Sequence, residues 1–346
     1  MTTTAYVTHP RYAEHTLPGH VEYAGRIQAV WRELDQAGLS ERMRTIEPPP
    51  ADLELVYTVH SKVYVQELQH ITHSINRIVL LNPDTYAGPA SFDIALLAAG
   101  GAVSAVDEVL AGRANNALAV VRPPGHHATA ATPMGFCLLA NAALAVQHAR
   151  LEFGLDRVLV VDYDVHHGNG TQDAFYHDPD VLFISTHQYP FYPGTGALED
   201  TGTGPGRGFT VNLPLPAGHG DLTYTALFGD IIWPLAERFQ PQLIVVSAGF
   251  DAHWADPLGG MALSLAGFAH ITSELITMAS QFCGGKIVFV LEGGYDLDAL
   301  AHGVCNSARL LLGDSVLSDP LGPAAGHSQP DITSLIAHVR RIHRLD

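Results

Sequence analysis

The feature that most constrains the fold is a set of short apolar runs in which polar and apolar residues do not alternate. Such runs are typical of strands buried on both faces, as in a parallel sheet covered by helices on either side. They occur at 117–121, 157–164, 180–187, 242–250 and 286–295. Helical periodicity predicts helices over 90–110, 138–153, 222–239, 265–282 and 297–312. The pattern predicts an α/β fold with a parallel sheet sandwiched between helices.

Nothing in the sequence divides the chain into separate units. The 346 residues contain no internal repeat and no long linker, so we expect a single domain over 1–346. The prolines at 48–50 predict a local loop within it.

Composition excludes several classes of protein. A net charge of −17 argues against nucleic-acid binding, which requires a basic face. No apolar stretch is long enough to span a membrane, and the N-terminal residues lack the pattern of a signal peptide. The three cysteines, Cys137, Cys283 and Cys305, show no paired spacing and are expected to be reduced core residues. We therefore expect a cytoplasmic protein that binds neither nucleic acid nor membranes.

Ionisable or glycine-rich segments follow the apolar runs where each predicted strand ends. In chain order these segments read RPPGHHA, DYDVHHGNG, STHQYPFYPGTG, GFDAHWADP and EGGYD. Ligands of open parallel sheets bind beyond the carboxyl ends of the strands. The segments therefore predict one shared site at that edge.

The spacing of Asp162, Asp164 and His166 indicates a metal site. On extended backbone, residues two apart point the same way, so their side chains should face one side at the strand tip. Crowded carboxylates and an imidazole call for a cation among them. Asp251, after another strand, is the natural third protein ligand. Oxygen and nitrogen donors suit zinc, iron(II), cobalt or manganese, whereas the simpler alternative gives these aspartates only capping and turn roles.

His126, His127 and Tyr295 are candidates for the chemistry. Neighbouring histidines point to one site only through a tight turn, which the preceding Pro-Pro-Gly can supply. Beside a hydrated metal they suggest a general base and an electrostatic partner. Tyr295 follows two glycines and could donate a hydrogen bond to an oxyanion, although a tyrosine there could also serve packing alone.

Taken together, these segments resemble the zinc-dependent histone deacetylases, particularly the class II-like bacterial members of the arginase–deacetylase superfamily. The resemblance covers roughly residues 122–297, with weaker similarity at LPGHVEYAGR upstream. It implies a parallel sheet of about eight strands between helix layers. The matching stretches, in the family's order, are RPPGHHA, MGFC, DYDVHHGNGTQDAF, PFYPGTG, GFDAHWADPLGG and LEGGYDL.

The resemblance also implies roles for single residues. The zinc ligands would be Asp164, His166 and Asp251. His127 would be general base and then acid, with Asn169 as its neutral partner.

The remaining catalytic roles follow from the same motifs. His126 would stay electrostatic, oriented by Asp162. Tyr295 would polarise the amide carbonyl, and the products would be acetate and a free amine.

The same resemblance implies a substrate tunnel. Phe136 and Tyr192 would form its walls, and the carbonyl of Gly135 would accept the amide N–H of an acyl-lysine. Asp84 lies near the position of a rim acid that grips the substrate backbone, on a looser match.

A monovalent cation, expected to be potassium, completes the implied cofactors. Its site could be built by the carbonyls of Asp162, His166 and Thr186 with the side chains of Asp164 and Ser185.

Three rival functions stay open at this point. Acetylated polyamines could be the substrate in place of acyl-lysine in proteins or peptides. An arginase-like site with two metals could use Asp251, His253 and Asp256. A catalytically inactive acyl-lysine-binding module would lack a ligand, the histidine pair or Tyr295, and all of these are present.

Two further segments resemble functional motifs, but we expect both to have ordinary structural roles. The glycines at 201–208 resemble a phosphate-binding loop but lead into the predicted strand FTVNLPL, so we expect an ordinary loop. The basic C-terminal HVRRIHR has the spacing of a solvated helix face.

Overall fold

The computed structural model of the protein describes residues 2–325 and 330–345, and its centre is an eight-stranded sheet. Every neighbouring pair in this sheet is parallel. The strand order is β2-β1-β5-β10-β9-β6-β7-β8. The bounds are β1 Thr4–Val7, β2 Arg44–Ile46, β5 Asn116–Ala119, β6 Val158–Asp162, β7 Val181–Gln188, β8 Thr210–Leu215, β9 Leu243–Ala248 and β10 Ile287–Leu291.

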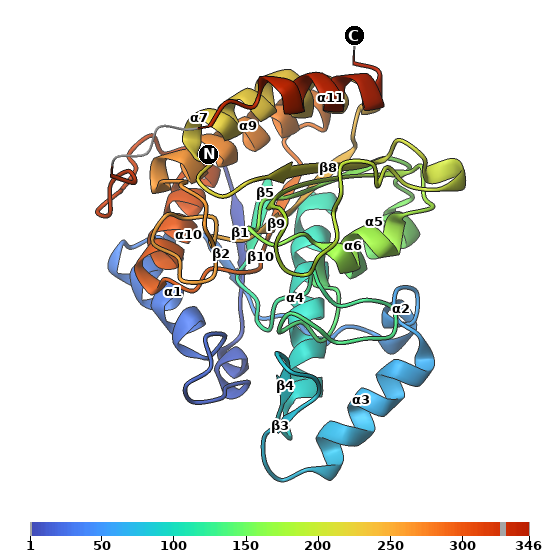
Figure 1. Ribbon diagram of the computed structural model, residues 1–346. Helices are drawn as coiled ribbons and strands as arrows, with labels where there is room; N and C mark the ends of the chain where they lie inside the picture. Colours follow the sequence, from blue (N-terminus) through green and yellow to red (C-terminus); the bar gives the residue numbers. More distant parts are fainter. Residues whose placement is uncertain (1, 326–329, 346) are drawn as a thin grey trace.

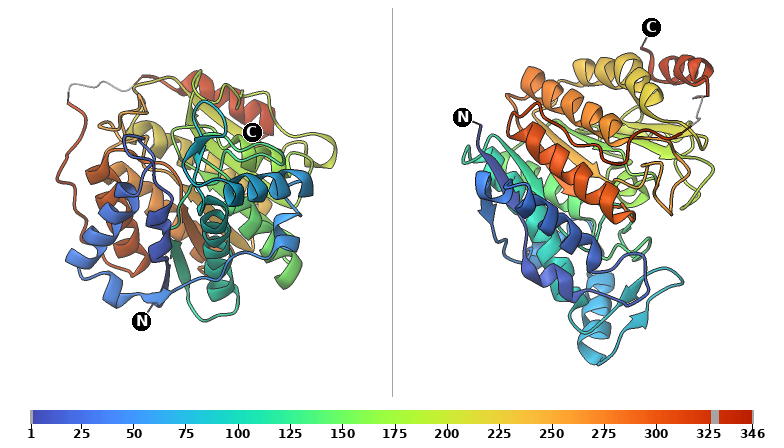
Figure 2. Two further views of the ribbon diagram at one scale, coloured as in Figure 1. Left: turned by 90° about the horizontal axis from the view of Figure 1, so that it is seen from below. Right: turned by 90° about the vertical axis from the view of Figure 1, so that its left-hand side faces the viewer.

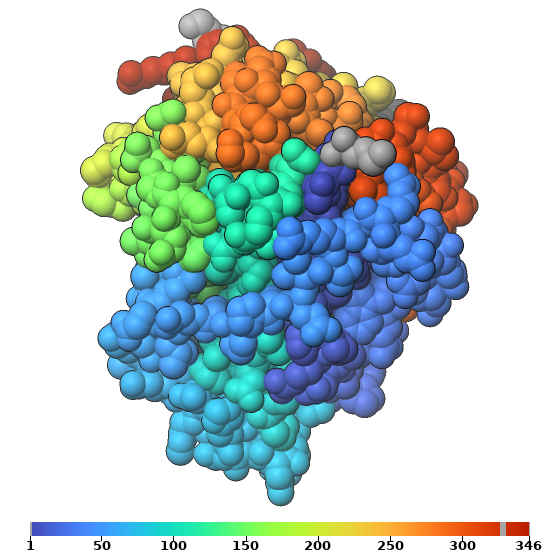
Figure 3. Space-filling model, turned by 180° about the vertical axis from the view of Figure 1, so that it is seen from behind, coloured from blue at the N-terminus to red at the C-terminus, as the bar shows by residue number. Residues whose placement is uncertain are grey.

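Helices cover both faces of the sheet (Figure 1). The long helix α4 packs against α5 on one face, while α1, α10 and α9 pack in series on the other. Seen from behind, the N-terminal residues occupy the lower part of the molecule and the orange segment that includes α9 the upper part (Figure 3). The longer helices are α1 Gly25–Gln36, α3 Lys62–Ser74, α4 Ser91–Leu110, α5 Asn141–Phe153, α9 Leu265–Phe282, α10 Leu297–Leu311 and α11 Thr333–His343.

One excursion protrudes from the layered body. It contains α2 Leu53–Val56, α3 and the small antiparallel pair of β3 Val79–Leu80 with β4 Tyr86–Ala87. In Figures 1 and 2 the segment with α3, β3 and β4 projects at one end. It brings the residues just before β4 to the edge of the sheet where the predicted site lies.

The five predicted strands correspond to β5, β6, β7, β9 and β10, and the expected fold is confirmed. The predicted strand after the glycine-rich loop is β8, where Pro214 is accommodated because β8 is an edge strand. β1 and β2 were not predicted, since four and three residues carry little periodicity.

The helix predicted over 222–239 is interrupted. α7 Asp221–Leu227 and α8 Trp233–Phe239 flank a π-helical turn at Phe228–Ile232. Pro234 has no N–H to donate to the carbonyl four residues back, that of Asp230. Arg340 of α11 donates to that carbonyl at 2.9 Å. A proline therefore breaks the ladder, and the basic face of α11 compensates.

The structure also bears on the three cysteines and on the length and hydropathy of the helices. Cys137, Cys283 and Cys305 are buried and unpaired, as expected. Among the described residues, no helix is both long and apolar enough to cross a membrane.

Candidate active site

Asp164, His166 and Asp251 converge at the carboxyl edge of the sheet. Each is buried, and one ligand atom from each lies within 4.8 Å of the others. Nδ1 of His166 is 3.1 Å from Oδ1 of Asp164 and 3.2 Å from Oδ2 of Asp251. The structure therefore brings together the three residues predicted to be metal ligands.

The two carboxylates are held by backbone amides on their outer side. The Gly293 amide donates to Oδ2 of Asp164 at 2.8 Å, and the Val165 amide donates to Oδ1 of Asp251, also at 2.8 Å. Gly293 must be glycine here, because a Cβ would collide with both carboxylates. The backbone thus fixes the orientation of the two acids before any ion binds.

The donor set fits a divalent cation. Burial, then the nearby charge of Asp164, raises the pKa of Asp251, which shows that the two acids repel in this setting. Burial alone would lower the pKa of His166, but its bonds to both carboxylates raise it to about 10. The cluster therefore demands positive charge between the carboxylates, and two oxygens with one imidazole nitrogen are donors that zinc accepts.

The period-two interpretation of this segment is wrong for Asp162. Strand β6 ends at Asp162, so the backbone turns before Asp164 and His166. Oδ1 of Asp162 accepts from the Asp164 amide at 3.1 Å, while Oδ2 lies 3.0 Å from Nδ1 of His126. Asp162 therefore faces the histidine pair and the turn, not the ligand group.

His126 and His127 lie side by side with opposite charge preferences. Their ring centroids are 4.0 Å apart. Burial would lower the pKa of His126, but the carboxylates of Asp164 and Asp162 outweigh it and raise that pKa well above the ordinary value. The pKa of His127 lies well below the ordinary value of a histidine, first because the ring is buried and then because of the charges of His126 and His166. His126 is thus the charged member of the pair and His127 the neutral one.

The partner of His127 sets its tautomer. Nδ1 of His127 lies 2.8 Å from Oδ1 of Asn169, an acceptor, so Nδ1 carries the hydrogen. Asn169 is anchored in turn by donating from Nδ2 to the carbonyl of His127 at 3.3 Å. Nε2 of His127 is left with a free lone pair, as a general base requires.

Tyr295 is presented by the turn that follows β10. Its amide donates to Oδ2 of Asp256 at 2.6 Å, and burial raises the pKa of its phenol well above the ordinary value. The phenol therefore stays protonated and able to donate. Asp256 also accepts a hydrogen bond from the Leu258 amide at 2.9 Å, so it braces the loop. Among the described residues, it does not belong to the group that could hold a metal.

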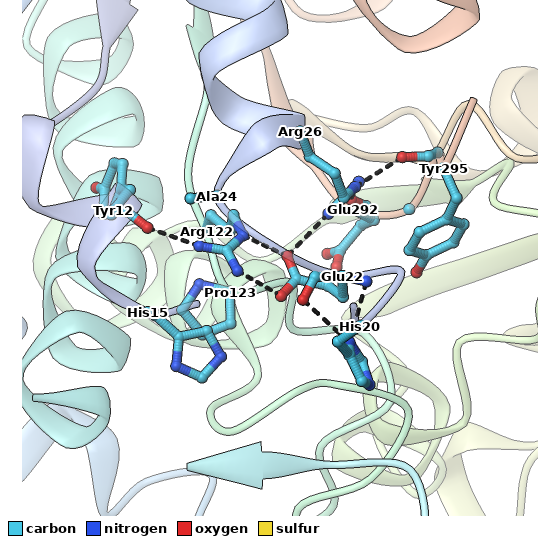
Figure 4. A network of polar contacts seen from close by, with 12 residues as sticks. Tyr12, His15, His20, Glu22, Ala24, Arg26, Arg122, Pro123, Glu292 and Tyr295 are labelled. Carbon is cyan, nitrogen blue, oxygen red and sulfur yellow. Dashed lines mark hydrogen bonds and ion pairs between the residues drawn. The ribbon is translucent and has the colours of Figure 1, made fainter. Parts of the chain in front are cut away.

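A buried ion network behind the site was missed by sequence reasoning (Figure 4). Glu22 accepts from Arg26 at 3.1 Å and from Arg122 at 2.7 Å. Arg26 also donates to the carbonyls of Gly294 and Glu292, both at 2.6 Å. The sequence signals were the i,i+4 spacing of Glu22 and Arg26, ordinarily a surface feature of helices, and the position of these residues in LPGHVEYAGR and of Arg122 in RPPGHHA.

A cavity of about 440 Å³ leads to His127, His166 and Tyr295. Phe136 and Tyr192, the predicted walls, both line it, and Phe136 holds a φ of 69° that is rare outside glycine. Phe191 and Leu258 complete the walls without having been predicted. The lining is thus mainly apolar and aromatic.

Asp84 lies in the same cavity but is already bonded within the protein. Oδ1 accepts from the Gly135 amide at 3.2 Å and from Thr85 at 2.6 Å. Oδ2 accepts from the Tyr192 hydroxyl at 2.8 Å. Asp84 therefore ties the loop of Gly135 to the opposite wall, and its grip on substrate stays a prediction.

The residues predicted for a monovalent cation lie together between β6 and β7. Asp162 and Ser185 are paired in register across the two strands. Ser185 Oγ lies 2.9 Å from Nδ1 of His187, and Thr186 Oγ1 donates to the Asp162 carbonyl at 3.4 Å. All are buried, so the neighbourhood is rich in oxygen atoms, while potassium itself stays a prediction.

The chain is similar to known proteins over most of its length. A family model described as the histone deacetylase domain matches residues 20–311. The chain is 40% identical to histone deacetylase 14, chloroplastic, of Arabidopsis thaliana, over 96% of this chain and 82% of that protein. It is 44% identical to a probable deacetylase of Archaeoglobus fulgidus, over 85% of this chain and 82% of that protein.

The fold is similar to a solved structure as well. The crystal structure of the HDA15 HD domain matches with a TM-score of 0.89 at 34% identity, over 99% of this chain and 94% of that chain. The similarity therefore extends through the whole layered body and the site it carries.

Proposed function

The chain belongs to the histone deacetylase family, and from this membership we propose that it hydrolyses the side-chain amide of acyl-lysine in proteins or peptides. Family membership supports deacetylase activity in general. The finer proposal, acyl-lysine as substrate and zinc as cofactor, rests on the cavity and on the donor set described above.

Asp164, His166 and Asp251 would hold the zinc ion, which when bound polarises a carbonyl oxygen and acidifies water. These three side chains converge, and their two buried carboxylates need a cation to compensate their charge. Among the described residues the ligand group contains neither His253 nor Asp256, which disfavours the arginase-like alternative, because Asp256 accepts backbone hydrogen bonds instead.

His127 carries the proton in the proposed reaction. Its neutral ring, with Nδ1 bonded to Asn169, presents Nε2 to the water that attacks the amide carbon. His127 takes one proton from that water and later gives it to the nitrogen of the departing amine. The C–N bond breaks, and acetate and a free amine are released.

Tyr295 and His126 stabilise the charge that develops on the carbonyl oxygen. The protonated phenol of Tyr295 donates to that oxygen as it becomes negative. His126, whose Nδ1 lies 3.0 Å from the Asp162 carboxylate, supplies positive charge at close range. His126 need not lose a proton in the cycle.

The lining of the cavity is the reason for proposing acyl-lysine as the substrate. It is mainly apolar and aromatic, and its only carboxylate, Asp84, already accepts bonds from Tyr192, Thr85 and Gly135. An acyl-lysine stem is an uncharged aliphatic chain, which such walls accommodate. A polyamine brings further ammonium groups that need acids nearby, and Asp84 is the single acid in this lining.

The test is turnover by the zinc-loaded protein on a panel of matched amides. Acetyl-lysine peptides should be cleaved with a higher kcat/KM than N-acetylputrescine or N8-acetylspermidine, and longer acyl-lysines report the depth of the cavity. A preference for the polyamines would overturn the substrate proposal. Tight binding of the peptide without any turnover would instead identify an inactive binding module.

We also propose a monovalent cation, potassium, beside β6 and β7, on the strength of the clustered oxygens of Asp162, Ser185 and Thr186. Protein dialysed against a tetramethylammonium buffer should lose activity or thermal stability and recover it with added KCl.

A further inference from the structure

A second cavity, of about 940 Å³, opens at the edge of the sheet opposite to the site described above. It is lined by residues that immediately precede the strands β6, β7 and β8, among them Arg157, Asp180 and Phe209. Because these strands are parallel, their starts lie away from the edge that carries Asp164 and His127. The second cavity is therefore separate from the proposed active site.

Positive charge is concentrated at this cavity. Arg157, Arg207, Arg238 and Arg344 line it, four of the 18 lysines and arginines in a chain with a net charge of −17. Within the described part of the chain none of these guanidiniums makes an ion pair: Arg157 and Arg238 donate to backbone carbonyls, at 2.8 Å and 2.6 Å. Four arginines without a carboxylate partner among the described residues therefore surround one hollow.

The nearby acids do not neutralise this surface. Asp180 lines the cavity but is paired with Arg150 at 3.1 Å, and Asp156 is the only other carboxylate in the lining. The lining therefore keeps a net positive charge, in contrast to the rest of the molecule.

A buried histidine gives a second, independent indication. His343 of α11 lines the cavity and is 4% exposed, yet neither ring nitrogen has a well-formed hydrogen bond within the described residues. Burial, then the charge of Arg238, lowers the pKa of His343 to about 4, opposed only by a weak bond to the Gly208 backbone. A buried polar group without a good partner is costly, and a bound anion would supply one.

We propose that this cavity binds a small phosphorylated molecule of nucleotide size. Planar guanidiniums match phosphate oxygens two at a time, and the lining contains arginine but no lysine. Phe209, Phe239 and Leu235 supply apolar wall for a base or a similar group. The volume lies in the range of small-molecule sites, and a concave hollow of this size suits such a ligand better than a protein surface.

Binding is measured by isothermal titration calorimetry on the full chain with ATP, inorganic pyrophosphate, inorganic phosphate, citrate and adenosine as probes. The proposal expects ATP and pyrophosphate to bind more tightly than citrate, with affinity falling as NaCl is raised. Because phosphates also bind metals, the titrations are repeated on metal-depleted Asp251→Ala protein, in which this binding should persist. Phosphate alone should bind weakly and adenosine not at all.

The variants Arg207→Gln and Arg344→Gln test whether the phosphate binds in this cavity. Neither side chain bonds to another described residue, so both variants should fold. Each should weaken pyrophosphate binding about tenfold or more. Arg341→Gln is the matched control, since Arg341 lies on α11, is exposed and does not line the cavity.

Several results would overturn the proposal. They are the absence of binding by any phosphate at millimolar concentration, citrate binding as tightly as pyrophosphate, and equal losses in the Arg207 and Arg341 variants. Loss of binding in metal-depleted protein would assign the phosphates to the active site. None of these outcomes depends on the substrate preference of the deacetylase.

Discussion

The guanidinium of Arg26 lies over the ring of Tyr295, 4.8 Å from its centroid, and bonds to the carbonyls of the turn that carries this tyrosine. A residue near the start of the chain therefore positions a proposed oxyanion donor near its end. Arg26 touches no reacting atom in the proposed mechanism, so it is a positioning residue.

Arg26→Lys should separate positioning from charge. Lysine keeps the positive charge beside Glu22 but cannot donate in three fixed directions at once, so Tyr295 should be held less accurately. We expect kcat to fall about 10- to 100-fold while zinc content stays unchanged. Arg32→Lys, on the exposed face of α1, is the control. An unchanged kcat would mean that the turn holds its shape without Arg26.

Tyr295→Phe removes only the hydroxyl group. Loss of one oxyanion donor typically costs about 10²–10³ in kcat, with KM much less affected. Tyr192→Phe is the matched control, because its hydroxyl bonds to Asp84 and not to the proposed oxyanion. Steady-state kinetics on one acetyl-lysine peptide compares the two, and similar losses in both would refute the assigned role.

Asn169→Asp tests the identity of the general base through the pH profile. A carboxylate in place of the Asn169 amide favours the protonated ring and therefore raises the pKa of His127. The base must be unprotonated, so the acidic limb of kcat/KM should move to higher pH. Asn76→Asp, at an exposed position, should leave the profile in place. A limb that does not move would mean that His127 is not the base.

Asp251→Ala should release the metal. The variant loses one of two carboxylates in a three-residue group, so zinc measured by mass spectrometry of the purified protein should fall far below one per chain. Asp256→Asn, in the same loop, keeps the size of the side chain and one acceptor oxygen, and it should retain zinc because Asp256 does not belong to the ligand group. Full zinc retention by folded Asp251→Ala protein would exclude this ligand assignment.

Glu22→Gln should give a pH-dependent loss of stability. Burial opposes the charge of Glu22, but Arg122 and Arg26 lower its pKa from 4.5 to about 2. Such a group contributes stability above pH 4.5 that is lost as pH falls toward 2, about 3 kcal/mol in all. Denaturant unfolding in the presence of a chelator should show the gap between wild type and variant closing over this range. A gap independent of pH would contradict the buried ion pair.

The apolar runs predicted the order and type of the central strands because burial on both faces leaves an unbroken apolar pattern. The ligand group could also be predicted, since its residues sit where those runs end. Periodicity alone placed the Asp162 side chain beside those of Asp164 and His166, because it cannot show where a strand stops and the chain turns; the contact with His126 agrees with the role that the family resemblance implied.

The ion network of Glu22, Arg26 and Arg122 could not be predicted for a different reason. Glu22 and Arg26 lie in LPGHVEYAGR and Arg122 opens RPPGHHA, but neither stretch shows that the three side chains meet, and only the tertiary fold places them together in the core. Phe191 and Leu258 were missed as tunnel walls because nothing in their local pattern distinguishes a cavity wall from packing.

A ribosome delivers Glu22 and Arg26 long before it delivers Gly294 and Tyr295. Until residues 292–295 are made, Arg26 has no carbonyls of that turn to bind, and the core next to the future site holds an incompletely satisfied cation. A chain stopped or cut after α9 keeps all three metal ligands and both histidines, yet lacks the turn that carries the phenol. Such a fragment also lacks β10, the strand between β5 and β9, and the Gly293 amide that orients Asp164, so the sheet and the site are completed by the same late segment of the chain.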